Sequence, residues 1–476
     1  MPSKAVRSLF APACAALLVL LACGSGGPAA APVPASTPTP PPKPNIILVV
    51  TDDLDVPSAA VLPQLDGLLA RAGVAFTSAF ANAPVCAPSR ASILTGLLTH
   101  NHGLRINTAP DGGFPAFRAR EGSTLATWLK SAGYRTALVG KYLNSYAIGA
   151  SDDYIPPGWD EWFGRLSAYE TLRYFEWWVN DNGRVYHYGD AAEDYSTDVE
   201  AKRAVDFVRR AATGGQPFFL YVTPEAPHVP SLYAERYGSE FRYELAPREP
   251  SFNESDVGDK PLFVRREPPL TDDQVDALDK LQRFRLRSMR AVEDLLGQLL
   301  QALSESGQMD RTFVIFTSDN GLLMGQHRIY AKKGVFYDEA ARVPLVIRGP
   351  GVPGGTARSE LVSLVDLAPT ILELAGATAP EALDGRSLVP FLRGQAAPGD
   401  WRRDVVLEVY NPHLNAALRT DRWSYVEWSS DEYELYDLVA DPHEMQSLHR
   451  TVDAGVMASY AARLRELTAC RGVACR

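Results

Sequence analysis

The chain has 476 residues, of which 46% are hydrophobic and 22% are charged, so its composition is that of a globular protein with a sizeable core. This composition excludes a fibrous protein and disorder over most of the chain. The 47 basic and 57 acidic residues give a formal net charge of −10. Because proteins that hold a phosphate backbone by bulk charge are basic, we expect no nucleic-acid partner. The length alone corresponds to roughly three domains, but α/β enzymes often put more residues into one continuous sheet, so we expect one large domain and one small one.

The first 22 residues have the pattern of an export signal. Lys4 and Arg7 precede an uncharged, largely apolar stretch at 8–22, which is shorter than the roughly 20 residues that span a bilayer. We therefore predict a cleaved signal peptide at 1–22. The end of this stretch, Leu-Leu-Ala-Cys at 20–23, resembles the lipobox of bacterial lipoproteins. The resemblance implies that Cys23 carries a lipid and holds the protein to a membrane, on the periplasmic or cell-surface side; the alternative is a plain secretory signal and a secreted protein.

Residues 23–44 are predicted to form an extended linker. Eight of the 36 prolines fall within 24–44, among alanine, serine, threonine and glycine. Such a segment has too few large apolar side chains to bury a core. It would connect the lipid-modified end to the folded part of the chain.

The cysteine pattern agrees with export. Cys14 is removed with the signal, which leaves four of the five cysteines. In an exported protein Cys470 and Cys475 are expected to form a disulfide. A metal site at this pair is the weaker alternative, because no histidine or further cysteine lies beside the two in the sequence. Cys86 then has no cysteine partner.

From residue 45 onward, predicted strands alternate with predicted amphipathic helices. The first apolar run, at 45–50, is too continuous for a half-exposed strand and is expected at the centre of a sheet. The alternation predicts an α/β fold in which helices cover both faces of a large, mostly parallel sheet. Further strands are expected at 134–139, 218–222, 312–317 and 343–347, and helices at 123–131, 197–211, 271–306 and 362–375.

After Gly385 the pattern changes to shorter β-rich segments. These lie at 405–409 and 416–428, and a helical segment follows at 453–468. We predict a main domain at 45–385 and a smaller C-terminal subdomain at 386–476, which is an antiparallel sheet with a final helix.

Polar side chains follow two of the strongest predicted strands. Asp52 and Asp53 follow the run at 45–50, and Asp319 and Asn320 follow the run at 312–317. Ligands of open α/β sheets bind beyond the carboxyl ends of the strands, so these side chains are expected to converge. Clustered carboxylates repel one another unless a cation lies between them, and an all-oxygen set suits Ca²⁺ or Mg²⁺ better than zinc. A single aspartate at a strand end more often caps the next helix, but two clusters favour a metal site.

A cysteine motif lies between these two clusters in the sequence. It has the form Cys-x-Pro-Ser-Arg from Cys86 to Arg90, and Thr-Gly follows at Gly96. Pro88 at a helix start would place residue 86 at the positive helix N-terminus, which suits an anionic substrate. The motif resembles the signature of type I sulfatases, in which the cysteine is oxidised to Cα-formylglycine.

The resemblance implies an alkaline-phosphatase-like fold and hydrolysis of sulfate monoesters. It implies that a separate formylglycine-generating enzyme modifies Cys86. One hydroxyl of the hydrated aldehyde would attack sulfur, and the second would then expel sulfate. A bound cation would lower the pKa of this diol and offset the charge of the sulfate. By resemblance this cation is Ca²⁺, with Mg²⁺ as the alternative, and its ligands are Asp52, Asp53, Cys86, Asp319 and Asn320.

Four basic side chains match positions of the family pattern. Arg90 matches the arginine that steadies the diol, and Lys141 matches a lysine that contacts diol and sulfate. His228 matches the histidine near the leaving-group oxygen. Lys333 matches the second sulfate lysine, with Lys332 beside it as the alternative.

One position departs from the pattern of many arylsulfatases. They have a histidine two residues after the lysine that corresponds to Lys141, where this chain has Leu143. The histidine usually takes the diol proton when sulfate is released. His102 and Asn144 are the candidates for this role here.

The departure itself resembles a narrower branch, which includes the N-acetylglucosamine-6-sulfatases and related bacterial sulfatases. This branch implies a 6-O-sulfated hexosamine or a similar sulfated glycan as substrate. The aromatic residues between 154 and 188 are expected to pack in the core or in a hairpin more than to stack on sugar rings. The segments that match the branch are 140–144, 157–162, 179–183, 250–254, 259–261 and 435–438.

Two alternatives stay open at this stage. Relatives of this fold hydrolyse phosphate monoesters or phosphonate esters with the same aldehyde. A surface lipoprotein that binds sulfated glycans without turnover is the other alternative, and it would require Cys86 to stay unoxidised.

Overall fold

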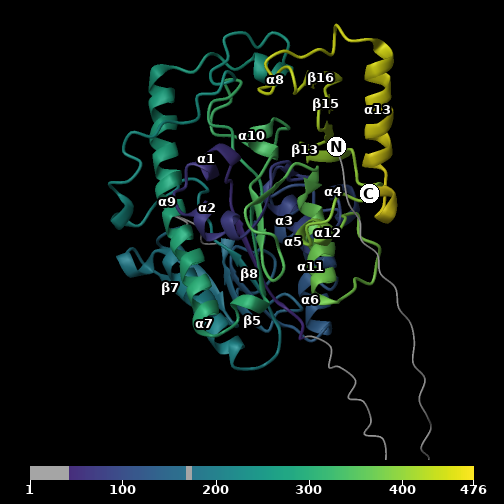
Figure 1. The fold of residues 1–476 in the computed structure, drawn as a ribbon. Coiled ribbons are helices and arrows are strands. Elements are labelled where there is room, and N and C mark those ends of the chain that lie inside the picture. The colour runs from purple at the N-terminus through teal and green to yellow at the C-terminus, as the bar shows by residue number, and fades with distance from the viewer. Residues whose placement is uncertain (1–41, 168–173) are drawn as a thin grey trace, which may run out of the picture. The chain divides into compact units, whose positions relative to one another are not determined.

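A ten-stranded sheet forms the centre of the computed structural model, which describes residues 42–167 and 174–476 (Figure 1). The order of its strands is β11-β2-β10-β9-β1-β8-β4-β5-β6-β7. The five central strands from β9 to β5 are parallel, whereas β10 and β6 pair antiparallel with both of their neighbours. The strands are β1 (Asn45–Thr51), β2 (Gly73–Phe76), β4 (Arg135–Gly140), β5 (Glu161–Arg165), β6 (Trp177–Asp181), β7 (Arg184–Tyr188), β8 (Phe218–Thr223), β9 (Thr312–Ser318), β10 (Leu345–Arg348) and β11 (Thr356–Arg358).

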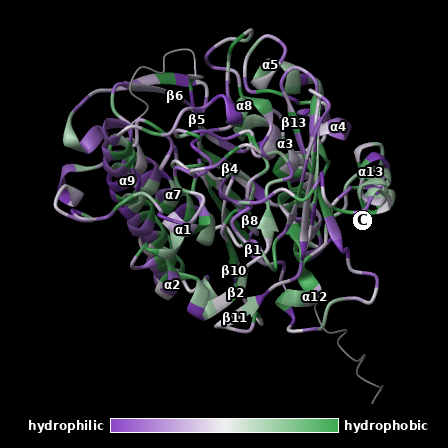
Figure 2. Ribbon diagram, turned by 90° about the horizontal axis from the view of Figure 1, so that it is seen from above, coloured by the Kyte–Doolittle hydropathy of each residue, from purple (hydrophilic) through white to green (hydrophobic). Residues whose placement is uncertain are grey.

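Strand β1 is buried on both faces, as its continuous apolar sequence predicted. Its alternate residues point to opposite faces of the sheet. Ile46 and Leu48 pack in one core with α3 (Cys86–Thr95), α6 (Leu125–Ser131) and α11 (Leu367–Ala375). Ile47 and Val49 pack in a second core with α7 (Ser196–Ala212) and α9 (Asp272–Glu305). Figure 2, seen from above, shows β1, β4 and β8 between α3 on one side and α7 and α9 on the other. The predicted α/β architecture is confirmed.

The segment predicted as a helix at 362–375 is helical only in its later part. Val362 and Ser363 form a short strand, β12, which pairs with β3 (Ala79–Phe80). A 3₁₀ turn, Leu364–Asp366, leads from this strand into α11. The pairing with β3 joins residues far apart in the sequence, so the local apolar pattern could not reveal it.

A second, four-stranded antiparallel sheet lies in the C-terminal part, as predicted. One face of this sheet packs against α13 (Ala454–Thr468) through Leu464 and Leu467. The other face packs against Phe80 and Phe336 of the main part. Residues 42–476 form one compact unit. The proposed division of this unit at 385/386 stays a prediction. The strands are β13 (Asp404–Tyr410), β14 (Leu414–Thr420), β15 (Trp423–Trp428) and β16 (Glu432–Asp437).

Within residues 42–167 and 174–476, no helix is both long enough and apolar enough to cross a membrane. The predicted signal peptide, Cys23 and nearly all of the predicted linker lie outside the described residues.

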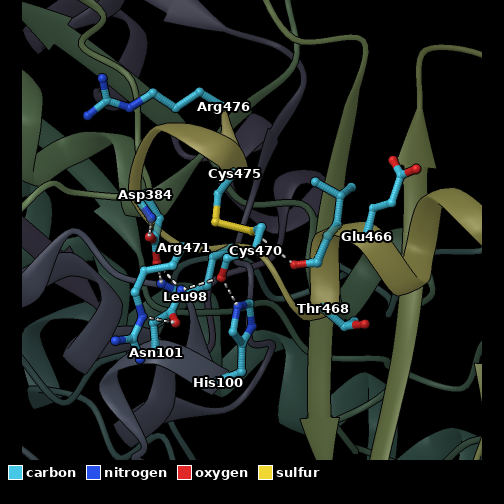
Figure 3. The surroundings of a disulfide bond; sticks show 12 residues. Leu98, His100, Asn101, Asp384, Glu466, Thr468, Cys470, Arg471, Cys475 and Arg476 are labelled. Atoms are coloured by element: carbon cyan, nitrogen blue, oxygen red, sulfur yellow. Dashed lines mark hydrogen bonds between the residues drawn. A yellow bond between two sulfur atoms is a disulfide. The ribbon is translucent and has the colours of Figure 1, made fainter.

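The chain ends in a loop that a disulfide between Cys470 and Cys475 closes (Figure 3). The fold brings a histidine to this pair, although none lies near it in the sequence. His100 belongs to α4 (Thr99–His102), and its Nε2 lies 2.9 Å from the carbonyl oxygen of Cys470. Since both sulfur atoms are used in the disulfide, they are not thiolate ligands, and His100 acts as a link between α4 and the loop.

Asp384 joins the same loop to α4. Its carboxylate accepts hydrogen bonds from the backbone N–H of Leu98 at 2.7 Å and of Gly472 at 2.6 Å. It also accepts one from Asn101 Nδ2 at 2.9 Å. The carboxylate is almost fully buried, so the two backbone N–H groups depend on it for a partner, whereas Asn101 Nδ2 also donates to the carbonyl of Cys470 at 3.0 Å.

We predict that Asp384→Ala lowers the free energy of unfolding by roughly 3 kcal/mol, because three donors around a buried site lose their acceptor. Urea denaturation followed by circular dichroism would measure the change. The control is Asp400→Ala, whose carboxylate is 82% exposed and lies 3.6 Å from Arg386. An exposed pair of this kind contributes about 0–1 kcal/mol. Equal losses of the free energy of unfolding in the two variants would contradict the interpretation that Asp384 links the C-terminal loop to α4.

Candidate active site

The polar residues after β1 and β9 converge at one edge of the main sheet. These strands pair in parallel with Thr51 opposite Ser318, so the residues that follow them are neighbours. The backbone N–H of Asp53 donates to Asp319 Oδ1 at 3.2 Å. Asn320 Nδ2 donates to Asp53 Oδ1 at 2.6 Å. Asp52, Asp53, Asp319 and Asn320 are all buried.

Cys86 is the first residue of α3, directly in front of this acidic cluster. Val85 before it has extended backbone, and Pro88 lies in the first turn, where a missing N–H group costs nothing. Cys86 Sγ is fully buried and donates to Asp52 Oδ1 at 3.3 Å. The backbone N–H of Ala87 donates to Asn107 Oδ1 at 2.9 Å. The residue therefore lies at the positive end of a helix dipole, beside carboxylates.

Gly96 ends this helix in the left-handed conformation, with φ of 67°. A Cβ atom there would lie 2.9 Å from Leu383 Cδ1 and 3.0 Å from the Cβ of Ala368. The glycine of the motif is thus needed for both the turn and the packing of α3 against the helix α11 that carries Ala368.

Arg90 lies one turn after Cys86 and balances the acidic cluster. Its Nε donates to Asp319 Oδ2 at 2.8 Å, and its Nη2 donates to Asp52 Oδ2 at 3.1 Å. Its Nη1 donates to the carbonyl of Lys141 at 3.0 Å. The side chain is fully buried. Its direct partners are thus two aspartates and the backbone that carries Lys141.

Both sulfate-site lysines of the family pattern lie at the cluster. Lys141 follows β4, and its Nζ donates to Asp52 Oδ2. Lys333 Nζ donates to Asp53 Oδ1 and, at 2.7 Å, to Cys86 Sγ. Lys332 is exposed, and its Nζ lies over the ring of Phe263. The geometry therefore places Lys333, rather than Lys332, at the site.

His228 faces the same cluster from the loop after β8. Its Nε2 lies 3.7 Å from Asp53 Oδ2. Its Nδ1 lies 2.7 Å from the carbonyl oxygen of Val229, which can only accept, so we assign the ring proton to Nδ1. Burial lowers the pKa of His228, although Asp53 and Asp52 oppose the shift. A neutral imidazole therefore turns an unprotonated Nε2 toward the site, beside Asp53.

The charges of the cluster shift one another's pKa values. Burial would raise the pKa of Asp52, but the charges of Lys141, Arg90 and Lys333 hold it well below its usual range. Burial and the charge of Asp52 raise the pKa of Asp319 to about 6. Burial and Asp52 also raise the pKa of the Cys86 thiol. The unmodified thiol is thus held neutral.

The donor set fits a divalent cation. Among the described residues, no hydrogen-bond donor reaches Oδ1 of Asn320, although this oxygen is buried. Ligand atoms of Asp52, Asp53, Cys86 and His228 all lie within 4.8 Å of one another. Carboxylate and amide oxygens are the ligands of hard cations such as Ca²⁺ and Mg²⁺.

The structure does not bring His102 to the site. Its Nε2 lies 3.1 Å from Ser92 Oγ, and its Nδ1 accepts from the backbone N–H of Leu104 at 3.0 Å. Burial lowers its pKa to about 3. Leu143 is fully buried in the core, and the backbone carbonyl of Asn144 accepts from the N–H of Phe114. His102 thus contacts the middle of α3 and not Cys86.

The aromatic residues between 154 and 188 pack both in the core, where the ring centroids of Trp159 and Trp162 lie 6.0 Å apart, and in the hairpin of β6 and β7. Trp177 stacks on Tyr188 with ring centroids 4.5 Å apart. Residues 168–173 of this region lie outside the described residues.

Two charged residues beside Lys141 were not anticipated from the sequence. Glu225 Oε1 lies 3.8 Å from Lys141 Nζ, and Glu225 Oε2 lies 3.9 Å from Arg165 Nε. The sequence position of Glu225 could have indicated it, because Glu225 follows the strand predicted at 218–222 and precedes His228 by three residues.

The chain is similar to known proteins over most of its length. Residues 44–377 match the family model described as Sulfatase, and residues 325–469 match the model of the N-sulphoglucosamine sulphohydrolase C-terminal region. The N-acetylglucosamine-6-sulfatase of Homo sapiens is 32% identical over 91% of this chain and 86% of its own length. The extracellular sulfatase Sulf-1 homolog of Caenorhabditis elegans is 34% identical over 76% of this chain, which spans about half (52%) of that relative.

Solved structures show the same fold. A protein in complex with its substrate D-glucosamine-2-N,6-O-disulfate has a TM-score of 0.73 and 24% identity, over 89% of this chain and 97% of its own. A phosphonate monoester hydrolase of Agrobacterium radiobacter has a TM-score of 0.70 and 24% identity, over 90% of this chain and 96% of its own. Together with the family model and the sequence relatives, these findings show that the chain belongs to the sulfatase family of sulfuric ester hydrolases.

Proposed function

We propose that the protein hydrolyses sulfate monoesters of a sulfated carbohydrate, with residue 86 as the nucleophile. The observation that carries the proposal is the position of Cys86. It begins a buried helix within hydrogen-bond distance of Asp52 and of Lys333. A small tetrahedral anion at this point would meet a helix N-terminus and two lysines.

We propose that a formylglycine-generating enzyme converts Cys86 to formylglycine, whose hydrate supplies the attacking hydroxyl. Lys141 and Lys333 would hold the sulfate oxygens. His228 would donate a proton to the leaving-group oxygen from Nε2 once it carries a second proton, while Nδ1 keeps its own proton on the carbonyl of Val229. Arg90 would keep Asp52 and Asp319 fixed, since it bridges both carboxylates.

The cation that we propose is Ca²⁺, with Mg²⁺ as the alternative. Asp52, Asp53, Asp319 and Asn320 would hold it together with residue 86. When bound, it would offset the charge of the sulfate oxygens and favour ionisation of the nucleophilic hydroxyl.

For the substrate we propose a 6-O-sulfated hexosamine or a similar sulfated glycan. The names of the relatives support this class, because they include N-acetylglucosamine-6-sulfatases and a protein solved with a 6-O-sulfated glucosamine. The phosphonate monoester hydrolase with the same fold makes phosphorus esters the alternative to test.

We also propose that the protein is exported through its N-terminal signal and attached to a membrane through lipid on Cys23. The charged start, the apolar stretch and the lipobox-like residues 20–23 support this proposal. Extracellular sulfatases among the relatives agree with export.

The first test is a comparison of kcat/KM on paired aryl sulfate and aryl phosphate, followed by a panel of sulfated sugars. We expect the matured enzyme to prefer the sulfate ester and to act on a 6-O-sulfated hexosamine. The mass of the peptide with residue 86 should be that of the aldehyde. Cys86→Ala should fold and show no turnover. Faster hydrolysis of phosphate or phosphonate esters than of every sulfate would refute the proposed activity.

Calcium should raise the melting temperature, because a ligand that binds only the folded state stabilises it by about 2.7 kcal/mol at a hundredfold excess over Kd. Asp319→Asn should abolish this rise, because it removes a carboxylate of the proposed site. Scanning calorimetry with and without chelator measures both. The matched control is Asp366→Asn, at a buried carboxylate bound by Arg402, which should keep the rise. A rise that persists in Asp319→Asn would exclude the proposed ligand set.

Cys23→Ala should move the protein from the detergent-extracted membrane fraction to a soluble or uncleaved form. Each buried CH₂ group of a lipid contributes about 0.8 kcal/mol to membrane binding, and firm anchoring needs more than one chain. Fractionation and the intact mass of the mature N-terminus measure this. Wild-type protein that is wholly soluble and carries no acyl mass would show that the lipid proposal is wrong.

A further inference from the structure

Three neighbouring parallel strands place charged residues side by side next to the proposed sulfate site. Gly140 at the end of β4 pairs with Thr223 of β8 on one side and with Gly164 of β5 on the other. Lys141, Glu225 and Arg165 follow these paired residues within one or two positions. The register of the sheet therefore brings the three side chains to the same edge.

The three side chains continue into a buried row of alternating charge. Glu225 lies between Lys141 and Arg165, at 3.8 Å and 3.9 Å from their nearest nitrogen atoms. Arg165 Nη1 donates to Glu200 Oε1 of α7 at 3.3 Å. These four side chains are at most 4% exposed. Charges without solvent are stable only beside opposite charges, so each member of the row holds its neighbour in place.

Arg165 is fixed by a second contact. Its guanidinium lies 4.8 Å from the ring centroid of Trp177, a residue of the neighbouring part of the sheet. This contact limits the positions that Arg165 can adopt, and through it those of Glu225.

The backbone of Glu225 also sets the position of His228. The N–H of His228 donates to the carbonyl of Glu225 at 2.9 Å. The hydroxyl of Tyr174 donates to the carbonyl of His228 at 2.6 Å and to that of Glu225 at 3.4 Å. One residue thus contacts Lys141 through its side chain and His228 through its main chain.

We propose that Glu225 is a positioning residue of the sulfate site, which holds Lys141 toward the sulfate and fixes the turn that carries His228, with Arg165 as its support. The proposal rests on the proposed function, in which Lys141 and His228 contact the substrate. Asp52 attracts Lys141 from one side, and Glu225 attracts it from the other. Without the charge of Glu225, Lys141 keeps only its contact with Asp52 among the ion pairs of the described residues, and Arg165 loses one of its two acidic neighbours.

The test is Glu225→Gln in the matured holoenzyme, with an aryl sulfate as substrate. We expect kcat/KM to fall about tenfold or more, with most of the loss in KM if Lys141 holds sulfate equally in the ground and transition states. The matched control is Glu293→Gln. Glu293 is also buried and paired with an arginine, Arg290, but it accepts hydrogen bonds from the backbone of Gln64 and Leu65 at α2 (Leu65–Leu68). This control should lose stability and keep kcat/KM within about twofold.

A double-mutant cycle separates positioning from general stability. In a Lys141→Met background, Glu225→Gln should change kcat/KM by less than about twofold, because its target is gone. If the fold-losses in kcat/KM of Glu225→Gln and Lys141→Met simply multiply in the double variant, the proposal is wrong. It is also wrong if Glu225→Gln has the kcat/KM of the wild type. If Glu225→Gln does not fold, Glu225→Asp serves instead. It keeps the charge but shortens the reach toward Lys141, and unchanged activity in it would also overturn the proposal.

Activity, together with the binding of inorganic sulfate measured by calorimetry, distinguishes a failure of the proposed function from a failure of the role of Glu225. A wild type that hydrolyses no sulfate ester would defeat the proposed function. If the wild type is active, and Lys141→Met binds sulfate more weakly whereas Glu225→Gln binds it as tightly as the wild type, only the role of Glu225 is defeated. Weaker binding in both variants supports it.

Discussion

The burial of three carboxylates at one edge of a parallel sheet is the constraint that shapes the rest of the site. Asp52, Asp53 and Asp319 have almost no contact with solvent. Buried charges of one sign are stable only when opposite charges or a cation face them. Arg90 supplies part of this balance from α3, and lysines from two distant loops supply more. The same positive groups that balance the acids are those that we propose to bind the sulfate, so stability and the proposed substrate binding depend on one arrangement.

The sequence predicted the central strands well, because a short, continuous apolar run such as the one at 45–50 is typical of a strand buried on both faces. Strand β1 ends one residue after the prediction, and Asp52 follows it directly. The choice between Lys332 and Lys333 could not be made from the sequence, since their loop has no periodic pattern. The contacts of Lys333 Nζ with Asp53 Oδ1 and Cys86 Sγ favour Lys333, whereas the exposed Lys332 forms a backbone bridge with Leu323. The contacts of Glu225 with Arg165 and of His100 with Cys470 were missed for the same reason: the sequence shows strand ends, but not which loops meet.

The C-terminal sheet contributes to the site although it carries none of the proposed catalytic residues. Tyr337, four residues after Lys333, donates to Glu434 Oε1 of β16 at 2.8 Å. The ring of Tyr337 stacks on His327 with centroids 4.1 Å apart, and His327 Nδ1 lies 2.7 Å from Glu254 Oε2. The loop of Lys333 is therefore bound on several sides by buried polar contacts. This network explains how a segment with little regular secondary structure can hold a lysine in place.

The pairing of β1 with β9 has a consequence for how the molecule is assembled. The hydrogen bond between Asp53 and Asp319 spans 266 positions of the chain. A growing chain can therefore complete the acidic cluster only after β9 has been made, and an N-terminal fragment that stops before β9 lacks half of it. Contacts of such long range also slow folding, because a long loop must close before they form. Until then the carboxylates of Asp52 and Asp53 stay in water. The chain already carries the cysteine motif, but the acidic cluster beside it is incomplete.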